Sequence, residues 1–295
     1  MRIQHKEGSL GRRMLCAVTP TFLGIGGQKT GSTWLYLQLD RHPEVSFGRG
    51  DPGGGLMRKE RHFWCRPLHR RVPDRPTISE WPRPDDLDRY LRSFDVPESI
   101  TGEISPHYAV MPRELVETVH RHLTDVRLVY VVRDPRRRAW SQAWSRLSKR
   151  GKRRGINLPT VWDRSTDSDQ PLDDESIAFL AEVLGQRGVK VHSDFGPVID
   201  RWASVFGGDR LLVLRSDAFR DDPRGSLATV YRHIGADPGF SHEIPETELA
   251  QWVNPHRPSP GAIPEELRPV LDEIYLPMVD RLEAATGWDL SEWRR

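Results

Sequence analysis

The stretch LGIGGQKTGSTWLY, residues Leu23–Tyr36, decides how the chain folds and what kind of ligand it can hold. The run 21–27 is apolar and ends in glycines, which is typical of a buried strand that passes into a turn. From Ser32 the apolar residues recur at helical spacing. A strand, a glycine-rich turn and a helix place backbone N–H groups and the positive end of the helix where an anion can bind.

The lysine of this stretch stands in an unusual place. In the Walker pattern G-x-x-x-x-G-K-[ST] the lysine follows the second glycine. Counted from Gly26, the second glycine is Gly31, but the next residue is Ser32 and the lysine, Lys29, comes earlier. The Rossmann pattern G-x-G-x-x-G fails as well, since Lys29 takes the place of its third glycine. Because glycine-rich turns also occur for packing reasons alone, this stretch by itself leaves the ligand open.

The rest of the chain alternates strand and helix patterns. Apolar runs predict further strands at 100–104, 127–133 and 209–215. Helical periodicity predicts helices at 134–147, 221–234 and 264–285. This alternation favours an α/β protein with a central parallel sheet. Two irregular regions, 48–84 and 150–176, are long for connections in a compact domain, and such loops are often functional.

The composition excludes several classes of protein. Of the 295 residues, 29% are charged and 37% hydrophobic, which indicates neither a disordered nor a membrane protein. No segment reaches the roughly 20 apolar residues of a membrane helix. The two cysteines, Cys16 and Cys65, are too few for a disulfide framework, and no metal-ligand cluster is evident. We expect a reduced, cytoplasmic protein without a signal peptide.

A second candidate anion site follows the strand at 127–133. Arg133 ends this strand, and Asp134 and Pro135 then suit the first positions of a helix. Seven residues at 100° per residue bring Ser141 back to the azimuth of Asp134. Arg133 and Ser141 would therefore converge above the strand end. Two anion sites on the carboxyl edge of one parallel sheet suit a nucleotide that carries phosphate at both its 5′ and 3′ ends.

These two motifs resemble those of the sulfotransferases that use 3′-phosphoadenosine 5′-phosphosulfate (PAPS). The family's 5′-phosphosulfate loop, K-[ST]-G-T-T-W, is matched by Lys29–Trp34, and its Arg and Ser of the 3′-phosphate motif by Arg133 and Ser141. The resemblance covers 20–145 and 195–235 well. It implies a P-loop-like three-layer α/β/α fold in a single domain, 1–295. Within it, 1–19 would be an N-terminal extension, 150–176 a mobile or acceptor-side loop, and 254–295 a C-terminal segment with a helix.

The resemblance also implies site residues. The cofactor would be PAPS as co-substrate, with 3′-phosphoadenosine 5′-phosphate (PAP) as product and no metal. Its binding site would consist of Lys29, Thr30, Gly31, Ser32, Thr33, Trp34, Arg133 and Ser141. Trp34 stands where some members stack an aromatic ring on adenine, although a core tryptophan would fit the same pattern.

Catalytic roles follow from the same resemblance. Lys29 would stabilise the leaving phosphate. In the heparan-type members a Glu two residues before a His is the base, and Glu60-Arg61-His62-Phe63-Trp64 matches that spacing. Glu60 would be the general base and His62 a helper that orients the base or the substrate. His107, near the position of the histidine base of cytosolic members, is the second candidate for the base.

Two other functions remain as alternatives. A kinase or another nucleotide-dependent transferase would need the Walker lysine that is missing. A nucleic-acid binder would use the basic run 127–154, which holds eleven Lys or Arg and one acid. We expect no nucleic-acid partner and no membrane span. We expect the acceptor to be a small molecule, a natural product or a glycan. Three tryptophans either line an apolar acceptor pocket or belong to the core: Trp81, Trp144 and Trp162. The oligomeric state cannot be predicted from the sequence.

Overall fold

The computed structural model describes residues 19–49, 60–69, 76–153, 172–251 and 262–295, with the side chains of 150–153 left out. Five strands form one sheet in the order β2-β3-β1-β4-β5, and every neighbouring pair is parallel. Their bounds are β1 (Phe22–Gly26), β2 (Val45–Ser46), β3 (Ile100–Ile104), β4 (Arg127–Val132) and β5 (Leu211–Arg215). The predicted central parallel sheet is confirmed.

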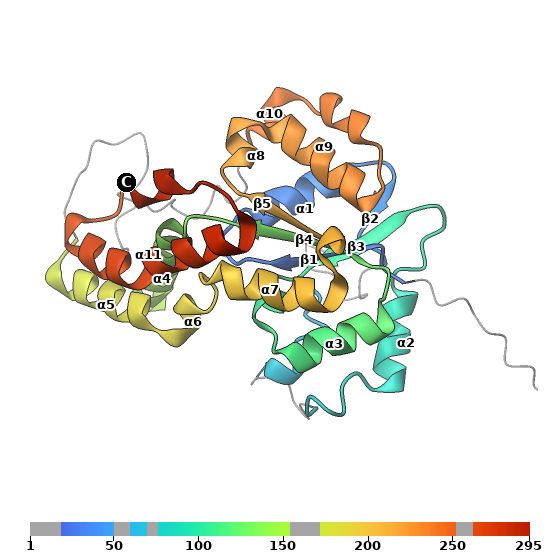
Figure 1. Cartoon of the computed structure of the whole chain (residues 1–295), viewed down its shortest axis with the longest axis horizontal. Helices are drawn as coiled ribbons and strands as arrows, with labels where there is room; N and C mark the ends of the chain where they lie inside the picture. Colours follow the sequence, from blue (N-terminus) through green and yellow to red (C-terminus); the bar gives the residue numbers. More distant parts are fainter. Residues whose placement is uncertain (1–18, 50–59, 70–75, 154–171, 252–261) are drawn as a thin grey trace, which may run out of the picture.

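Helices cover both faces of this sheet (Figure 1). On one face, α3 (Arg113–His122) and α7 (Phe195–Phe206) pack against the sheet, and on the other α1 (Ser32–Asp40) and α9 (Pro223–Ile234) do. The side chains of β4 alternate between these two layers, because successive residues of a strand point to opposite faces. Leu128, Tyr130 and Val132 join the first layer, and Val129 and Val131 the second.

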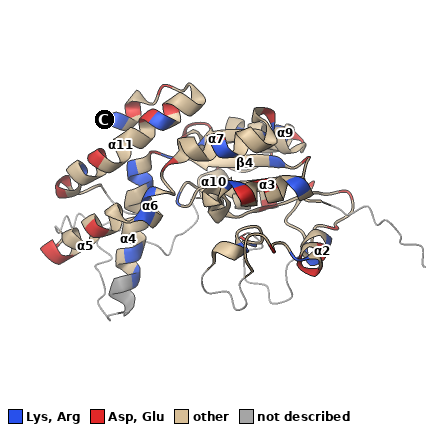
Figure 2. Ribbon diagram, turned by 60° about the horizontal axis from the view of Figure 1, so that its bottom comes forward, with Lys and Arg blue, Asp and Glu red and all other residues tan. Residues whose placement is uncertain are grey.

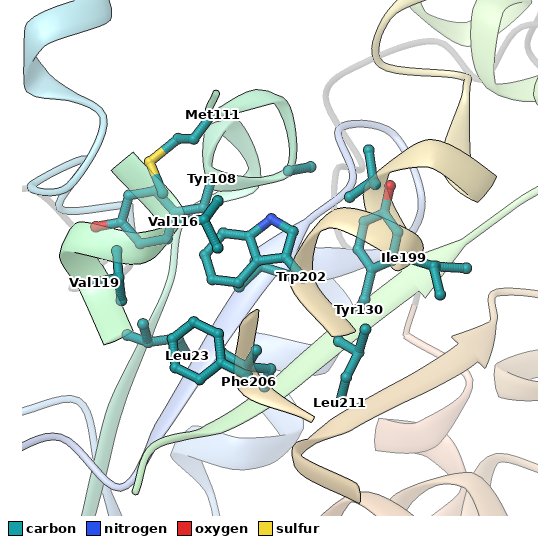
Figure 3. Packing of buried hydrophobic residues seen from close by; sticks show 14 of the residues in the cluster. Leu23, Tyr108, Met111, Val116, Val119, Tyr130, Ile199, Trp202, Phe206 and Leu211 are labelled. Carbon is teal, nitrogen blue, oxygen red and sulfur yellow. The ribbon is translucent and has the colours of Figure 1, made fainter. Parts of the chain in front are cut away.

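The centre of the first layer is Trp202 of α7, which is fully buried (Figure 3). Leu23 of β1, Tyr130 of β4, and Val116 and Val119 of α3 belong to the same cluster. Burying a side chain of this size contributes about 1.5–3 kcal/mol or more. This packing fixes β1 and β4 side by side, and the strand ends that carry the predicted anion sites are fixed with them.

A third cluster lies beside the sheet, where α4 (Pro135–Arg153), α5 (Asp174–Gly185) and α11 (Arg268–Thr286) pack together. Trp140, Trp144 and Leu147 of α4 share its buried face, as their spacing predicts. The remaining helices are α2 (Pro84–Arg92), α6 (Arg187–Lys190), α8 (Ala218–Asp221), α10 (Glu246–Leu249) and the 3₁₀ turns η1 (Arg66–Leu68), η2 (Pro106–Val110), η3 (Gly208–Arg210), η4 (Pro238–His242), η5 (Glu265–Leu267) and η6 (Ser291–Arg294).

Most predicted boundaries hold within a few residues. Helix α9 ends at Gly235, which adopts the left-handed conformation of a C-cap glycine. The last helix starts later than predicted, since residues 265–267 form a 3₁₀ turn, and it runs through Pro277. Within the described ranges, no helix is both long and apolar enough to cross a membrane. The proposed loop at 150–176 lies mostly outside these ranges, and α4 occupies its first residues.

Candidate functional site

The turn after β1 is built by close packing. A Cβ at Gly26 would lie 2.7 Å from the Cβ of Ala109, so only glycine fits between the turn and the 3₁₀ turn η2 beneath it. Gly31 caps α1 with φ 100°, a conformation that favours glycine. The first turn of α1 contains no acidic residue. The positive end of this helix is therefore available to an anion.

The hydroxyls of this turn have different positions. The Thr30 hydroxyl is buried and donates to the Gly27 carbonyl at 2.8 Å, so it shapes the turn from within. Ser32 is also buried, whereas Lys29 and Thr33 are partly exposed. The predicted phosphate contacts of these residues stay predictions, and Thr30 would have to exchange its partner to make one.

The two predicted anion-binding motifs meet. Arg133, which follows β4, donates from Nη1 to the backbone carbonyl of Lys29 at 3.0 Å. Burial and the neighbouring Arg220 together lower the pKa of Arg133 to about 10, although Asp217 and Asp134 oppose this effect. A desolvated cation with a second cation nearby favours a bound anion, because an opposite charge stabilises the charged form. Residues 104 positions apart in the sequence thus share one electropositive site.

The start of α4 follows the prediction. The Asp134 carboxylate accepts the backbone N–H of Arg136 at 2.8 Å and so caps the helix. Ser141 lies on the next turns of α4 and is partly exposed. Arg138 is fully buried and donates to Ser193, Gln142 and the Val189 carbonyl. It therefore holds α4 in place and is not open to a ligand.

In the segment that carries the candidate base, alternate backbone N–H groups donate hydrogen bonds to residues at the end of β3 and after it. Glu60 donates to the Ile104 carbonyl at 2.9 Å, His62 to Ser105 Oγ at 3.0 Å, and Trp64 to the Tyr108 hydroxyl at 3.3 Å. These acceptors continue β3 into η2. The segment 60–65 thus runs beside the carboxyl end of β3, next to the turn that holds Lys29.

Backbone strain coincides with the predicted catalytic residues. Among the described residues, four that are not glycine have positive φ: Lys29 (67°), Glu60 (69°), His62 (53°) and Glu98 (58°). Three of these four are the residues that the sequence analysis assigned to catalysis. Because such conformations cost energy and persist only where surrounding contacts enforce them, their clustering supports a functional role for the site.

Glu103 of β3 is a buried residue that the sequence analysis missed. One of its oxygens accepts the hydroxyls of Tyr90 and Tyr108, both at 2.8 Å, and the other accepts Ser105 Oγ at 2.7 Å. Ser105 and Tyr108 in turn hold the segment 60–65. Burial and the Glu103 charge raise the pKa of both tyrosines. A charged residue inside an otherwise uncharged, buried strand was the signal that could have revealed this network.

A cluster of imidazoles connects the Lys29 turn to the base. Gln28 Nε2 lies 2.9 Å from Nε2 of His107. The His107 ring lies 4.9 Å from the ring of His62, and Nε2 of His62 lies 3.6 Å from Glu60. The structure therefore brings Lys29, Glu60, His62 and His107 into one continuous region. Neither Gln28 nor these ring contacts were predicted.

Cys65 lies beside these imidazoles. Its Sγ is 3.2 Å from Nε2 of His69 and 3.9 Å from Nδ1 of His62. The sequence analysis found no metal-ligand cluster, but here three potential ligand atoms lie within 4.8 Å of one another. The spacing H-x₂-C-x₃-H was the signal for this cluster.

The described tryptophans with a proposed ligand role are buried in the hydrophobic core. Trp34 is 1% exposed, stacks on Phe219 and donates to the Leu249 carbonyl, so its adenine-stacking role stays a prediction. Trp81 and Trp144 are buried in different clusters and do not line one pocket together. Trp162 lies outside the described residues.

Part of the basic run is engaged within the protein. Figure 2 shows Lys and Arg at several positions along α4. Arg136 pairs with Asp272 at 2.7 Å and also donates to the Trp293 carbonyl. Arg138 is buried, and Arg137, which is 62% exposed, lies near Asp134. These three arginines therefore do not form a continuous open basic face, and the absence of a nucleic-acid partner stays a prediction.

His192 should make the folded protein sensitive to acid. Burial and then Arg138, His107 and Arg146 lower its pKa to about 3. The unfolded chain has a pKa near 6.5 there, so between these values the unfolded state binds a proton that the folded state does not. The free energy of unfolding should fall by up to about 1.4 kcal/mol per pH unit as pH decreases through this window.

Urea denaturation with EDTA at pH 6.5 and 4.5 measures this dependence. The change in the free energy of unfolding between these two pH values should become smaller in His192→Phe. The substitution breaks no hydrogen bond of Nδ1, since that atom of His192 has no hydrogen-bond partner among the described residues. The change should stay at its wild-type size in His242→Phe, which alters an exposed histidine. Equal changes in the wild type and His192→Phe would contradict the assignment.

Comparisons with known proteins complete the description of this site. No family model matches the chain. Bifunctional heparan sulfate N-deacetylase/N-sulfotransferase 4 of Mus musculus is 23% identical over 244 residues, 81% of this chain and 25% of that protein. Its counterpart 2 of Homo sapiens is 23% identical over 247 residues, 81% of this chain and 24% of that protein. The chain thus spans about a quarter of the length of these curated relatives.

A solved structure has the same fold. A sulfotransferase from Alicyclobacillus acidocaldarius superposes with a TM-score of 0.62 at 20% identity, covering 94% of this chain and 99% of that one. The predicted three-layer α/β/α, P-loop-like fold class is therefore confirmed.

Proposed function

We propose that the chain is a sulfotransferase, as its similarity to the N-sulfotransferase relatives suggests, and that it transfers the sulfuryl group of PAPS to a hydroxyl or amine of an acceptor. The observation that carries the proposal is the contact between Arg133 and the Lys29 carbonyl. It joins the turn after β1 and the end of β4 into one electropositive site. A nucleotide with two separate phosphate groups needs such a site.

The proposed nucleotide contacts follow from this arrangement. The 5′-phosphosulfate occupies the N-terminal end of α1, with Lys29 and the hydroxyls of the turn around it. The 3′-phosphate binds Arg133 and Ser141. Two features support this placement: the desolvated Arg133 with Arg220 nearby, and the absence of acidic residues from the first turn of α1.

The proposed chemistry uses two groups. Glu60 takes the proton from the acceptor hydroxyl or amine, whose freed electron pair forms a bond to sulfur. The bond between sulfur and the oxygen that bridges it to phosphorus breaks, and that oxygen keeps the electron pair as PAP leaves. Lys29 balances the charge that develops on this oxygen. His62, 3.6 Å from the Glu60 carboxylate, positions the base.

Removing either cation should weaken nucleotide binding. Lys29→Ala and Arg133→Ala should each raise the Kd for PAP about 10–150-fold, because one charge-assisted phosphate contact contributes about 1.5–3 kcal/mol. Arg127→Ala is the matched control, since Arg127 stands at the opposite end of β4 and is exposed. Unchanged affinity in both site variants would contradict the assignment.

Calorimetric titration of the whole chain with PAP, 5′-AMP and ATP tests the function itself. We expect tight binding of PAP that depends on the 3′-phosphate and needs no Mg²⁺. A preference for ATP with Mg²⁺, or no binding of PAP, would overturn the proposal. The relatives' names refer to heparan sulfate, and for this chain we propose a glycan, natural product or small molecule as acceptor and the cytoplasm as its location.

A further inference from the structure

Two side chains of the segment 60–69, Cys65 and His69, have no role in the proposed sulfuryl transfer, and both lie next to His62. His62, Cys65 and His69 each offer one potential ligand atom, and these atoms lie within 4.8 Å of one another. Cys65 is 1% exposed, and the two histidines are partly exposed. Because all three come from eight consecutive residues, their meeting depends on local backbone geometry.

The distances fit a tetrahedral metal site. Zinc binds thiolate sulfur at about 2.3 Å and imidazole nitrogen at about 2.0–2.1 Å, which places neighbouring ligand atoms about 3.4–3.6 Å apart. The observed separations from Cys65 Sγ are 3.2 Å to Nε2 of His69 and 3.9 Å to Nδ1 of His62. Shifts of a few tenths of an ångström would therefore bring each histidine nitrogen to the distance from Cys65 Sγ that a shared ion requires.

The surroundings of His62 also fit a metal ligand. Its Nδ1 faces Cys65, and its other nitrogen, Nε2, lies 3.6 Å from the Glu60 carboxylate. Metal-binding histidines usually donate their second ring N–H to a carboxylate or carbonyl, which fixes the tautomer and the ring orientation. Glu60 stands in that position.

We propose that His62, Cys65 and His69 bind one divalent transition-metal ion of the zinc type. A thiolate with two imidazoles suits zinc and disfavours Mg²⁺ and Ca²⁺, which prefer oxygen ligands. Binding replaces the thiol proton of Cys65 with the metal and releases that proton to solvent. The ion fixes the backbone of 62–69 and the ring of His62, and through that ring it orients Glu60.

This inference does not rest on the proposed function, because the three ligands are defined without the nucleotide. It can fail while PAP still binds, and PAP binding can fail while the metal site exists. Titrations with metal alone separate the two outcomes.

Cobalt is the probe, because four-coordinate Co²⁺ with a thiolate ligand has intense visible bands and a sulfur-to-cobalt charge-transfer band. The full chain is stripped with a chelator, dialysed and titrated with Co²⁺ alone. We expect the visible bands and the charge-transfer band to appear and to saturate at one equivalent of Co²⁺. Both sets of bands should disappear when Zn²⁺ is added. Weak featureless spectra without that band would overturn the proposal.

Matched variants identify the ligands. Cys65→Ser should abolish the charge-transfer band, while Cys16→Ser, which removes the other cysteine of the chain, should keep it. His69→Ala should weaken Co²⁺ binding by at least about 100-fold, since even the loss of an outer-shell partner costs 10–100-fold. His242→Ala removes an exposed histidine and should bind like the wild type. If Cys65→Ser does not fold, the test is the comparison of Co²⁺ affinity between His69→Ala and His242→Ala. Equal Co²⁺ affinities in these two variants would overturn the site.

Discussion

Glu60→Gln should lower the turnover number for sulfuryl transfer by about 10²–10⁴-fold and leave the Kd for PAP within about twofold of the wild-type value. Glutamine has nearly the same shape, so the φ of 69° at this position and its surroundings are retained. It cannot, however, accept the acceptor's proton. The loss should therefore appear in the turnover number, because the missing step belongs to the transition state.

The measurement is PAP release from PAPS with the best acceptor from a panel of hydroxyl- and amine-bearing sugars and small molecules. Glu98→Gln is the matched control: Glu98 is also an exposed glutamate with positive φ, 58°, but it lies outside the imidazole cluster. Wild-type turnover in Glu60→Gln would remove Glu60 from the mechanism. If His107→Ala then lost activity while binding PAP normally, His107 would be the base.

His107 is the weaker candidate on structural grounds. Burial, followed by the charges of His62 and His69, lowers its pKa to about 4. A neutral imidazole with so low a pKa is a poor proton acceptor near neutral pH. Its contact with Gln28 Nε2 at 2.9 Å also occupies the ring nitrogen nearest the Lys29 turn.

The fold could be predicted where the signals are local. The apolar run of β4 and the glycines after β1 are continuous in the sequence, and both elements formed close to their predicted bounds. Strand β2 escaped prediction because two residues, Val45 and Ser46, hold no periodicity. Its pairing with β3 places it in the sheet, which no pattern within the stretch reveals.

The site was predictable to the same extent. Lys29, Glu60 and Arg133 belong to short motifs, so they could be named from the sequence alone. The Gln28–His107 contact joins residues 79 positions apart, and the hydrogen bond from Trp64 to Tyr90 joins residues 26 apart. Contacts of this kind depend on the strand order, which a single sequence does not specify. The ligand set of His62, Cys65 and His69, in contrast, is local and could have been recognised.

Glu103→Ala should destabilise the folded protein by about 3–5 kcal/mol, the largest stability effect that we expect in this region. The substitution leaves the hydroxyls of Tyr90, Tyr108 and Ser105 without their common acceptor inside the protein. Each buried donor left unpaired costs about 1–3 kcal/mol. Because the variant no longer buries a carboxylate, whose removal from water is costly, part of this sum is offset.

Chemical denaturation measures the effect, with Glu114→Ala as the control, because Glu114 is exposed on α3. Glu103→Gln should cost less than Glu103→Ala, since its amide oxygen still accepts both tyrosine hydroxyls while the charge is lost. Equal stability of Glu103→Ala and Glu114→Ala would show that the network contributes nothing.

A double-mutant cycle separates this network from simple loss of volume, and it works even if Glu103→Ala does not fold. Tyr108→Phe and Glu103→Gln each change one partner of a 2.8 Å hydrogen bond. Their combined effect should differ from the sum of the single effects by at least about 0.5 kcal/mol, as expected for residues of one hydrogen-bond network. The Tyr108 hydroxyl also accepts the Trp64 N–H, and Ser105, which donates to Glu103, accepts the His62 N–H. Both single variants should therefore lower the turnover number as well, by loosening the segment that carries Glu60. Additive free energies with unchanged turnover would mean that Glu103 neither stabilises this segment nor positions the base.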